Sequence, residues 1–598
     1  MDTIARLPGR GQNAFFCGGN QTSFRVLQLA PQLTFPELSF PVSSSSPIPD
    51  TLFFAGKGPE DRKMLERCFE LPIPFLVLGG RWPRKLSLSL CSRASENGMR
   101  ILGPRSEGII VPCMQPGVPG NTALLADGGD VLVRCLSAFQ QRRAPLRYAF
   151  SFGEAVDYSP LEAASSILQS DSQTDFYVFI LKELREGRKF LDFASDAAKK
   201  GKRTAVLLLR RPQTSSREET AALKQFGVVL LNDIQEIVDG ALAFLALKNS
   251  DLSGGKECAY HTSSDELSML IKKEAERAEF TLQESARATS PLLIDVLSGS
   301  DSLNTVQRRK QRIEQSGRLP VFSSLADNAL FEEQLYSAKI PLIPGIRRCF
   351  NALQLVFGSG PAVCPAPSEG AHPTKCPLHP RPTEYDAKVL LRAYDIPVAR
   401  EALCHSLPEA LTAAETIGYP IALKVMSPSI LRKTEARVIA LDVQNEEELK
   451  NAYGRTLEKA RIANPSARIR GVLVQEMVHG GTEWRMEYRK DPRFGPVVEM
   501  SISGIFGEIF PDGVLRAAPF DTDEALRMIK ESKGYPLLLA GWRRERLDVE
   551  AFASSLAAFS RLAYCETEIA RLDVNPVFVN RIGVLVVDAF IERRGGIR

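Results

Sequence analysis

Short apolar runs alternate with amphipathic stretches along the first 357 residues. The runs are four to six residues long and rich in Leu, Val, Ile and Phe, which is typical of buried strands, while the stretches between them favour helices. This alternation predicts a parallel sheet with helices on both faces. Strands are expected at residues 13–17, 51–55, 75–79, 122–126, 148–152, 176–181, 204–209 and 228–231.

The segment from residue 248 to residue 357 predicts a smaller third α/β unit. A polar stretch, 248–265, precedes a charged segment, 266–286, that we expect to be one helix. Strands are expected at 291–297 and 320–323, and an apolar turn at 341–345 leads into a helix that ends near Phe357.

A Pro- and Gly-rich segment at 358–383 reads as a linker, because its composition excludes a helix or a central strand. After it the pattern changes to α+β, with strands expected near 420–426, 437–443, 471–477, 496–502, 514–517 and 583–588. The pattern predicts domains at 1–115, 116–250, 251–357 and 384–598, with the linker between the last two.

Composition narrows the classes of function. Hydrophobic residues are 44% and charged residues 24% of the 598, and the formal net charge is +4, so nothing favours a nucleic-acid or membrane partner. We see neither an apolar stretch long enough to span a membrane nor a signal-peptide core at the start. The 11 cysteines, without tight spacing, are typical of reduced thiols, which predicts a cytoplasmic protein.

Gly18 and Gly19 follow the first expected strand and precede a helix. This order places backbone N–H groups where a nucleotide phosphate can bind. The G-x-G-x-x-G spacing is absent, so an ordinary strand-to-helix turn is the competing interpretation.

The residues after the linker contain the most specific motifs: TEYDAK, IALKV with Lys424, QEMVHGGTEW with residues 475–484, GIFGE with Glu508, and RLDVNP with Asn575. Together and in this order they resemble the ATP-grasp domain of NDP-forming acyl-CoA synthetases, a superfamily that includes ADP-forming acetate–CoA ligase and succinate–CoA ligase. The resemblance implies ATP or ADP and Mg²⁺ as ligands.

The resemblance assigns residues to the nucleotide. Lys424, on a strand, would be a point charge for the phosphates, and a sheet lysine that only extends to solvent is the alternative. Gln475, Glu476 and Met477 end a strand that passes adenine in the family. Glu483 matches a carboxylate near the ribose or the phosphates.

Asn575 and Asp588 match the family's metal ligands, and their hard oxygens suit Mg²⁺. The alternative is a turn asparagine before proline and an aspartate at a strand end. Glu508 is a further matching carboxylate, which we group with these metal ligands.

The front of the chain resembles the same superfamily more weakly, in residues 98–104, 120–126, 151–154 and 185–191. These segments look like a CoA-binding Rossmann-like domain followed by a flavodoxin-like ligase domain, and 251–357 would be a reduced second flavodoxin-like unit. Binding of CoA is doubtful, because the glycine turn at the start is degraded.

The chain departs from the family along one chemical route, which in the family passes through a phosphorylated histidine. The loop that carries this histidine corresponds to RRPQTSSREET, residues 210–220, which contains none. Arg432 stands where the family has a second histidine, and an arginine stays protonated. Lys182 replaces a supporting glutamate unless a one-residue shift restores Glu183, and Asp127 stands where phosphate would bind.

The five histidines offer few substitutes. His261, between Tyr260 and Thr262, resembles the carrier motif, but it lies later in the sequence than the family's carrier histidine. We expect His479 to be a surface residue. A zinc site at Cys364, His372, Cys376 and His379 would need tighter spacing than these residues have.

These losses predict a diverged or catalytically impaired relative, with no catalytic residue retained, that acts by binding a nucleotide, acyl-CoA, a protein partner or a second copy of itself. The alternative is an active ADP-forming acyl-CoA synthetase with a different phosphoryl carrier. A third interpretation is an ATP-grasp ligase of another kind.

Overall fold

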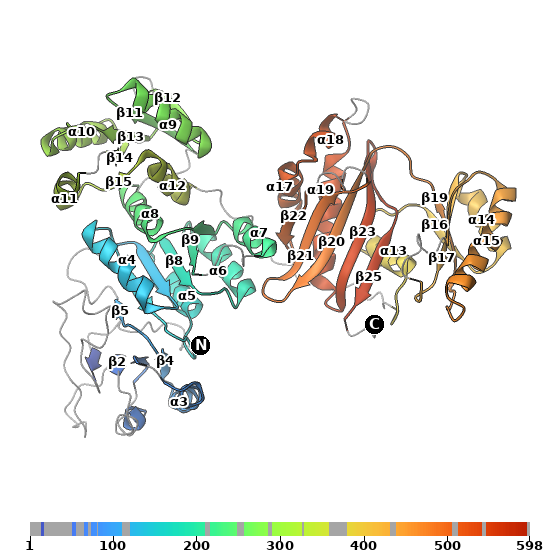
Figure 1. The fold of residues 1–598 in the computed structure, drawn as a ribbon, viewed down its shortest axis with the longest axis horizontal. Helices are drawn as coiled ribbons and strands as arrows, with labels where there is room; N and C mark the ends of the chain where they lie inside the picture. Colours follow the sequence, from blue (N-terminus) through green and yellow to red (C-terminus); the bar gives the residue numbers. More distant parts are fainter. Residues whose placement is uncertain are drawn as a thin grey trace. The chain divides into compact units, whose positions relative to one another are not determined.

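The computed structural model of the chain forms two compact units (Figure 1). The first comprises Met1–Arg185, Lys189–Thr214 and Gly227–Pro361, and the second comprises Glu186–Arg188, Ser215–Phe226 and Ala362–Arg598. The structure describes residues 14–16, 51–54, 65–69, 73–80, 82–110, 120–209, 216–247, 256–284, 290–298, 300–325, 328–357, 379–430, 438–504, 507, 512–540 and 546–594.

The first sheet is short and entirely parallel. Its order is β1 (Ala14–Phe16), β2 (Thr51–Phe54), β3 (Phe75–Leu78) and β4 (Arg100–Leu102). The described residues of β2 and β3 are all buried, and α3 (Arg84–Glu96) follows β3. Continuous apolar strands of this kind are expected where both faces of a sheet are covered.

The second sheet has the order β10-β9-β8-β6-β7-β5. Its parallel strands are β6 (Thr122–Ala126), β7 (Tyr148–Ser151), β8 (Phe176–Leu181), β9 (Arg203–Leu208) and β10 (Val229–Leu231), and β5 (Ile109–Ile110) pairs antiparallel with β7. The intervening helices are α4 (Gly129–Gln141), α5 (Pro160–Ser170), α6 (Gly187–Lys199), α7 (Arg217–Gln225) and α8 (Ile234–Ala246).

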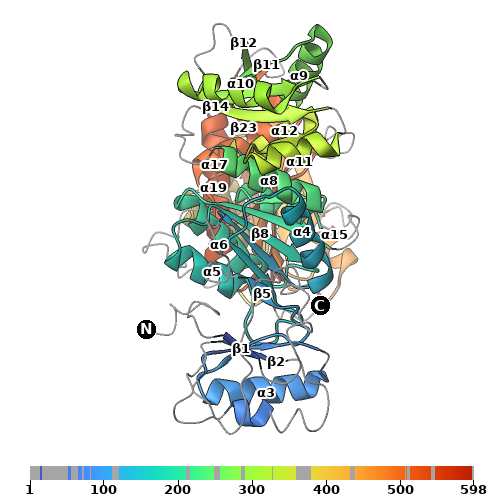
Figure 2. The same cartoon turned by 90° about the vertical axis from the view of Figure 1, so that its left-hand side faces the viewer.

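The third sheet is parallel throughout, in the order β12-β11-β13-β14-β15. Its strands are β11 (Glu257–His261), β12 (Thr281–Glu284), β13 (Leu292–Leu297), β14 (Leu319–Ser324) and β15 (Leu342–Pro344), and its helices are α9 (Asp265–Arg277), α10 (Leu303–Gln315), α11 (Ala329–Ser337) and α12 (Ile346–Phe357). Figure 2 shows α12 beside α8, and both contribute to one apolar core shared by the second and third sheets.

The second unit contains two antiparallel sheets. One has the order β16-β19-β17-β18, and the other has the order β22-β21-β20-β23-β24, with β25 also paired to β23. The strands are β16 (Glu401–Cys404), β17 (Ile421–Met426), β18 (Ile439–Val443), β19 (Gly471–Glu476), β20 (Thr482–Asp491), β21 (Gly495–Ile502), β22 (Val514–Ala517), β23 (Ile569–Asn580), β24 (Gly583–Val586) and β25 (Ala589–Arg593).

Helices of the second unit cover these sheets. The helices α14 (Leu407–Ile417) and α15 (Glu446–Ala463) share a core with the sheet β16-β19-β17-β18. The core of the larger sheet is completed by α13 (Glu384–Ala393), α17 (Thr522–Glu531), α18 (Tyr535–Ala540) and α19 (Val549–Cys565). The expected mixed α/β architecture, parallel first and α+β at the end, is therefore confirmed.

The prediction of one helix over residues 266–286 is wrong in its second half. Helix α9 ends at Arg277, Glu279 has a φ of 58°, and β12 follows. A positive φ is incompatible with a continuing right-handed helix. The polar stretch before it also contains a strand, β11, whose ends are exposed but whose Cys258 and Ala259 are fully buried.

Two long strands of the larger sheet were not anticipated either. In β20 and β23, buried apolar residues alternate with charged ones, so each strand has one buried face.

Among the residues that the structure describes, no helix is long and apolar enough to cross a membrane.

Candidate functional site

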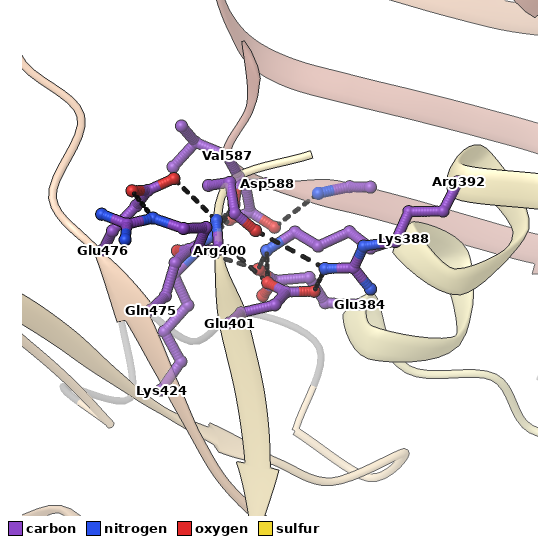
Figure 3. Close-up of polar contacts among 12 residues, drawn as sticks. Glu384, Lys388, Arg392, Arg400, Glu401, Lys424, Gln475, Glu476, Val587 and Asp588 are labelled. Atoms are coloured by element: carbon purple, nitrogen blue, oxygen red, sulfur yellow. Dashed lines mark hydrogen bonds and ion pairs between the residues drawn. The ribbon is translucent and has the colours of Figure 1, made fainter. Parts of the chain in front are cut away.

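Lys424 lies on β17 at the point where the two sheets of the second unit meet (Figure 3). Its side chain is 5% exposed, and its Nζ donates to Glu384 Oε1 at 2.8 Å and to the Val587 carbonyl at 3.1 Å. Asp588 Oδ2 lies 3.9 Å away. Lys424 comes from the smaller sheet and Val587 from the turn between β24 and β25, so these bonds join the two sheets.

A second buried lysine completes the cluster. Lys388 lies one turn after Glu384 on α13, and its Nζ donates to Glu384 Oε1 at 2.5 Å and to Glu401 Oε2 at 2.9 Å. The Glu401 carboxylate is fully buried and also accepts from Arg392 at 2.8 Å. The carboxylates of Glu384 and Glu401 thus compensate the charges of Lys388, Lys424 and Arg392. The two lysines are buried, and Arg392 is partly exposed to solvent.

The two lysines have opposite pKa shifts. Burial acts to lower the pKa of Lys424, but the Glu384 and Asp588 carboxylates outweigh it, so the pKa is raised. Burial prevails at Lys388 and lowers its pKa, helped by the charge of Lys424, although Glu384 opposes it. Lys424 is therefore the ammonium group that stays firmly protonated beside the exposed edge of Asp588.

Gln475 and Glu476 are the last two residues of β19, and Met477 follows the strand directly. Gln475 is fully buried: its Nε2 donates to the Val587 carbonyl at 2.9 Å, and its Oε1 is buried without a partner among the described residues. The Glu476 carboxylate accepts from the backbone N–H and the Nε of Arg400, both at 2.7 Å. The Met477 N–H donates to the Pro420 carbonyl at 3.3 Å.

Asn575 and Asp588, two of the residues expected to bind a metal, lie side by side, on β23 and in the turn between β24 and β25. The Asn575 N–H donates to the Asp588 carbonyl at 3.1 Å. Asn575 Oδ1 accepts from the Ser503 hydroxyl at 2.5 Å, and the Asp588 side chain is 39% exposed. Glu483 is exposed on β20, and its Oε2 would lie 2.8 Å from a Cβ built on Gly504.

These donors fit Mg²⁺ only in part by themselves. Asn575 and Asp588 supply hard oxygens, and Mg²⁺ is usually held by one or two protein oxygens together with nucleotide phosphates and water. No group of three His, Cys, Asp or Glu side chains suited to a metal ion occurs in the described ranges. A bound Mg²⁺ ion would neutralise phosphate charge. Because Asn575 and Asp588 supply only part of its ligands, phosphate oxygens of a nucleotide and water would have to complete its coordination.

Glu384, Lys388 and Glu401 are the polar residues that the sequence analysis missed. The signal was present in TEYDAK, because Glu384 and Lys388 are four residues apart and face the same side of a helix. An acid and a base on the buried face of a helix would have predicted an internal ion pair.

Some predicted residues lie outside the described part of the chain: Gly18, Gly19, Arg432, Glu508, Cys364, His372 and Cys376, together with residues 210–215 of the loop that would carry the family's histidine. His379 is described, and its Nδ1 lies 3.0 Å from the Arg381 carbonyl.

Two carboxylates lie at the start of α4 in the first unit. Asp127 Oδ2 accepts from the Lys182 N–H at 3.1 Å, and burial raises the pKa of Asp127 although that bond opposes it. Glu107 packs directly on Gly129, where an added Cβ would lie 1.8 Å from Glu107 Cγ. Glu183 is exposed and paired with Arg185. The positive end of the α4 dipole is therefore already next to acidic side chains of the chain itself.

Comparisons with known proteins agree with this architecture. A family described as ATP-grasp domain matches residues 380–592, and one described as succinyl-CoA ligase like flavodoxin domain matches residues 119–244.

Acetate–CoA ligase [ADP-forming] II subunit beta of Pyrococcus furiosus is 42% identical over 215 residues, which is 36% of this chain and 91% of that protein. Acetate–CoA ligase [ADP-forming] I of Archaeoglobus fulgidus is 25% identical over 576 residues, 84% of this chain and 83% of that protein. The Ca. Korarchaeum cryptofilum dinucleotide forming acetyl-coenzyme A synthetase 1, solved with coenzyme A, Ca-AMPCP and HgCl+, is 37% identical over 36% of this chain and 93% of that one, with a TM-score of 0.34. On its domains and relatives, the chain belongs to the NDP-forming acyl-CoA synthetase superfamily.

Proposed function

We propose that the second unit binds a magnesium–nucleotide complex, ATP or ADP, with Lys424 as the phosphate cation and Asn575 and Asp588 as the protein ligands of the metal. The observation that carries this proposal is the Lys424 ammonium, anchored on one side by Glu384 and 3.9 Å from Asp588 on the other. A lysine held in this way presents a fixed positive charge next to hard oxygens.

We further propose that the chain has diverged from acyl-CoA synthesis through phosphohistidine. The loop 210–220 lacks histidine, and Glu107 and Asp127 place carboxylates at the start of α4, where a phosphate would be repelled. The chain would then act by binding a nucleotide or acyl-CoA and by contacting a protein partner or a second copy. One relative is itself named as a subunit.

Calorimetry of the full chain with Mg-ATP and, separately, with CoA tests this proposal. Lys424→Ala should weaken Mg-ATP binding by about 1–3 kcal/mol, the usual range for a charge-assisted hydrogen bond. Lys450→Ala is the matched control, because Lys450 is half exposed and its ion pair among the described residues is with Glu446 of its own helix. Equal affinities of parent and Lys424→Ala would contradict the assignment, provided that both melt cooperatively.

The second candidate is an active ADP-forming acyl-CoA synthetase that converts a carboxylate, CoA and ATP to acyl-CoA, ADP and phosphate. The observation that favours it is the relative aligned over 84% of this chain. ATP-dependent formation of a CoA thioester from any carboxylate of a test panel would establish it and overturn the divergence.

A further inference from the structure

A pocket of about 430 Å³ lies in the first unit, at the outer edge of the second sheet. It is lined by the edge strand β10, the start of α8, one side of α12 and Arg277 at the end of α9. These elements come from the second and third sheets, which share one apolar core. Pockets of roughly 300–1,000 Å³ between such packed layers are typical of small-molecule sites.

Part of the pocket lining is apolar. Leu230, in the middle of β10, is 37% exposed, whereas Ala352 and Leu355 of α12 line the pocket as buried side chains. β10 is the last strand of its sheet and pairs with β9 on one side, so its outer backbone groups have no strand partner in the described ranges. A ligand can therefore bury an apolar group here and bond to backbone N–H and C=O groups.

The α12 side of the pocket is positively charged. Two buried carboxylates each bind two arginines: Asp239 binds Arg142 and Arg348, and Glu274 binds Arg277 and Arg347. One carboxylate cannot neutralise two guanidinium groups, so each cluster has one positive charge in excess. Arg348 and Arg277 line the pocket, and their side chains are 37% and 42% exposed. Both can therefore pair with an anionic group of a ligand.

The start of α8 brings negative charge to the same pocket. Asp233 is the N-cap of α8, and Glu236 lies in its first turn. Glu236 accepts from the backbone N–H of Asn232 at 2.8 Å, and Asp233 accepts from the backbone N–H of Glu236 at 2.9 Å. Neither carboxylate forms an ion pair within the described part of the chain. The helix dipole offsets only about half a charge, so more than one negative charge remains.

We propose that this pocket binds a free α-amino acid with an apolar side chain. The carboxylate of the ligand pairs with Arg277 and Arg348, its ammonium group pairs with Asp233 and Glu236, and its side chain packs on Leu230. A zwitterion compensates both groups of charges, whereas an anion or a cation would compensate one of them. The pocket shares no residue with the proposed nucleotide site, so this inference does not depend on the proposed function.

Calorimetry of the full chain with L-leucine and with L-phenylalanine tests the proposal. We expect saturable binding of at least one of the two amino acids. The N-acetyl form of the tighter binder lacks the ammonium group, and its amide lacks the carboxylate. Each should bind about 10- to 100-fold more weakly than the free amino acid, which is the loss expected when a hydrogen bond to a charged group is removed.

Two variants locate the charges. Glu236→Gln should weaken binding of the amino acid by about 10-fold or more and leave its N-acetyl form unchanged, because that form has no ammonium group. Arg277→Gln should weaken the amino acid and leave its amide unchanged, and Arg347 still pairs with the buried Glu274 in this variant. Glu266→Gln, at an exposed position in the first turn of α9, is the matched control and should change no affinity.

Three results would overturn the amino-acid site. The first is the absence of saturable binding of both amino acids. The second is equally tight binding of the N-acetyl form or of the amide, because the pocket would then recognise a single charge. The third is parental affinity in folded Glu236→Gln and Arg277→Gln variants, which would place the binding elsewhere. The comparison of the three ligand forms uses the parent chain, so it does not depend on the folding of any variant.

Discussion

Lys424 Nζ and Glu384 Oε1 are 2.8 Å apart, although the two residues lie 40 positions apart in the sequence, one on a strand and the other on a helix. Lys388 donates to the same carboxylate oxygen. The two lysines therefore have different roles. Lys388 compensates the charge of the buried carboxylates, whereas Lys424 has a raised pKa and lies next to Asp588. The proposed phosphate cation is thus positioned by an internal charge network before any nucleotide arrives.

The network should be costly to break. Glu401→Ala removes the carboxylate that accepts from Lys388 and Arg392 and leaves the buried Lys388 and Lys424 to share the Glu384 carboxylate, so we expect a loss of about 3–5 kcal/mol in the free energy of unfolding. Urea unfolding of the full chain, followed by a probe of the second unit, measures it. Glu446→Ala, which removes an exposed partner of Lys450, should cost less than about 0.5 kcal/mol. Similar losses in both variants would show that the network does not stabilise the fold.

Gly504 and Gly495 offer a matched pair for Glu483. Both have positive φ, 63° and 80°, but an added Cβ at Gly504 would meet Glu483 Oε2 at 2.8 Å, whereas one at Gly495 would meet nothing within 4 Å. Alanine should cost each site about 1–2 kcal/mol of backbone strain. Only Gly504→Ala should also displace the Glu483 carboxylate and change the affinity for Mg-ATP in calorimetry. Unchanged affinity in Gly504→Ala would remove Glu483 from the proposed site.

The contact between Glu107 and Gly129 predicts a coupled pair. Gly129→Ala should destabilise the first unit by about 1–3 kcal/mol, because the new Cβ would overlap Glu107 Cγ. In a Glu107→Ala background this cost should fall, because Cγ and Cδ are removed while the Cβ at 2.7 Å remains, and a double-mutant cycle in denaturant measures the coupling. Gly454→Ala, at a helical glycine with open space around it, should instead stabilise α15 by about 0.5–1 kcal/mol. Additive costs at residues 107 and 129 would contradict the packing.

His261 Nδ1 lies 2.9 Å from Oδ1 of the buried Asp295 carboxylate, and this pair predicts a pH dependence of stability. The hydrogen bond to Asp295 is the main cause that raises the pKa of His261; burial and Arg309 oppose it, and Asp301 adds to it. A raised pKa means that the stabilisation is complete below the unfolded value, near 6.5, and is lost as pH rises through the folded value. The stability difference between parent and His261→Gln should therefore shrink as the pH rises above about 6.5. A constant or growing difference would contradict the ion pair.

Local patterning predicted much of the fold. Strands such as β3 and β8 are continuous apolar runs, and their boundaries follow from hydrophobicity alone. The strand β11 of the third sheet could not be predicted in this way, since it begins and ends with the exposed residues Glu257 and His261 and its sequence looks polar. The end of α9 depends on the left-handed backbone of Glu279, which leaves no mark in a glutamate-rich sequence.

The sequence by itself determined the order of the α/β and α+β regions, the motif residues Lys424, Asn575 and Asp588, and the absence of histidine from loop 210–220. Only the tertiary structure decided that Glu384 anchors Lys424 and that Asp295 orients His261. The reason is physical: composition and periodicity act over a few neighbouring residues, whereas the pairing of two side chains depends on which strands become neighbours in a sheet. That pairing is set by burial of the whole core, and it turns separate polar residues into a site.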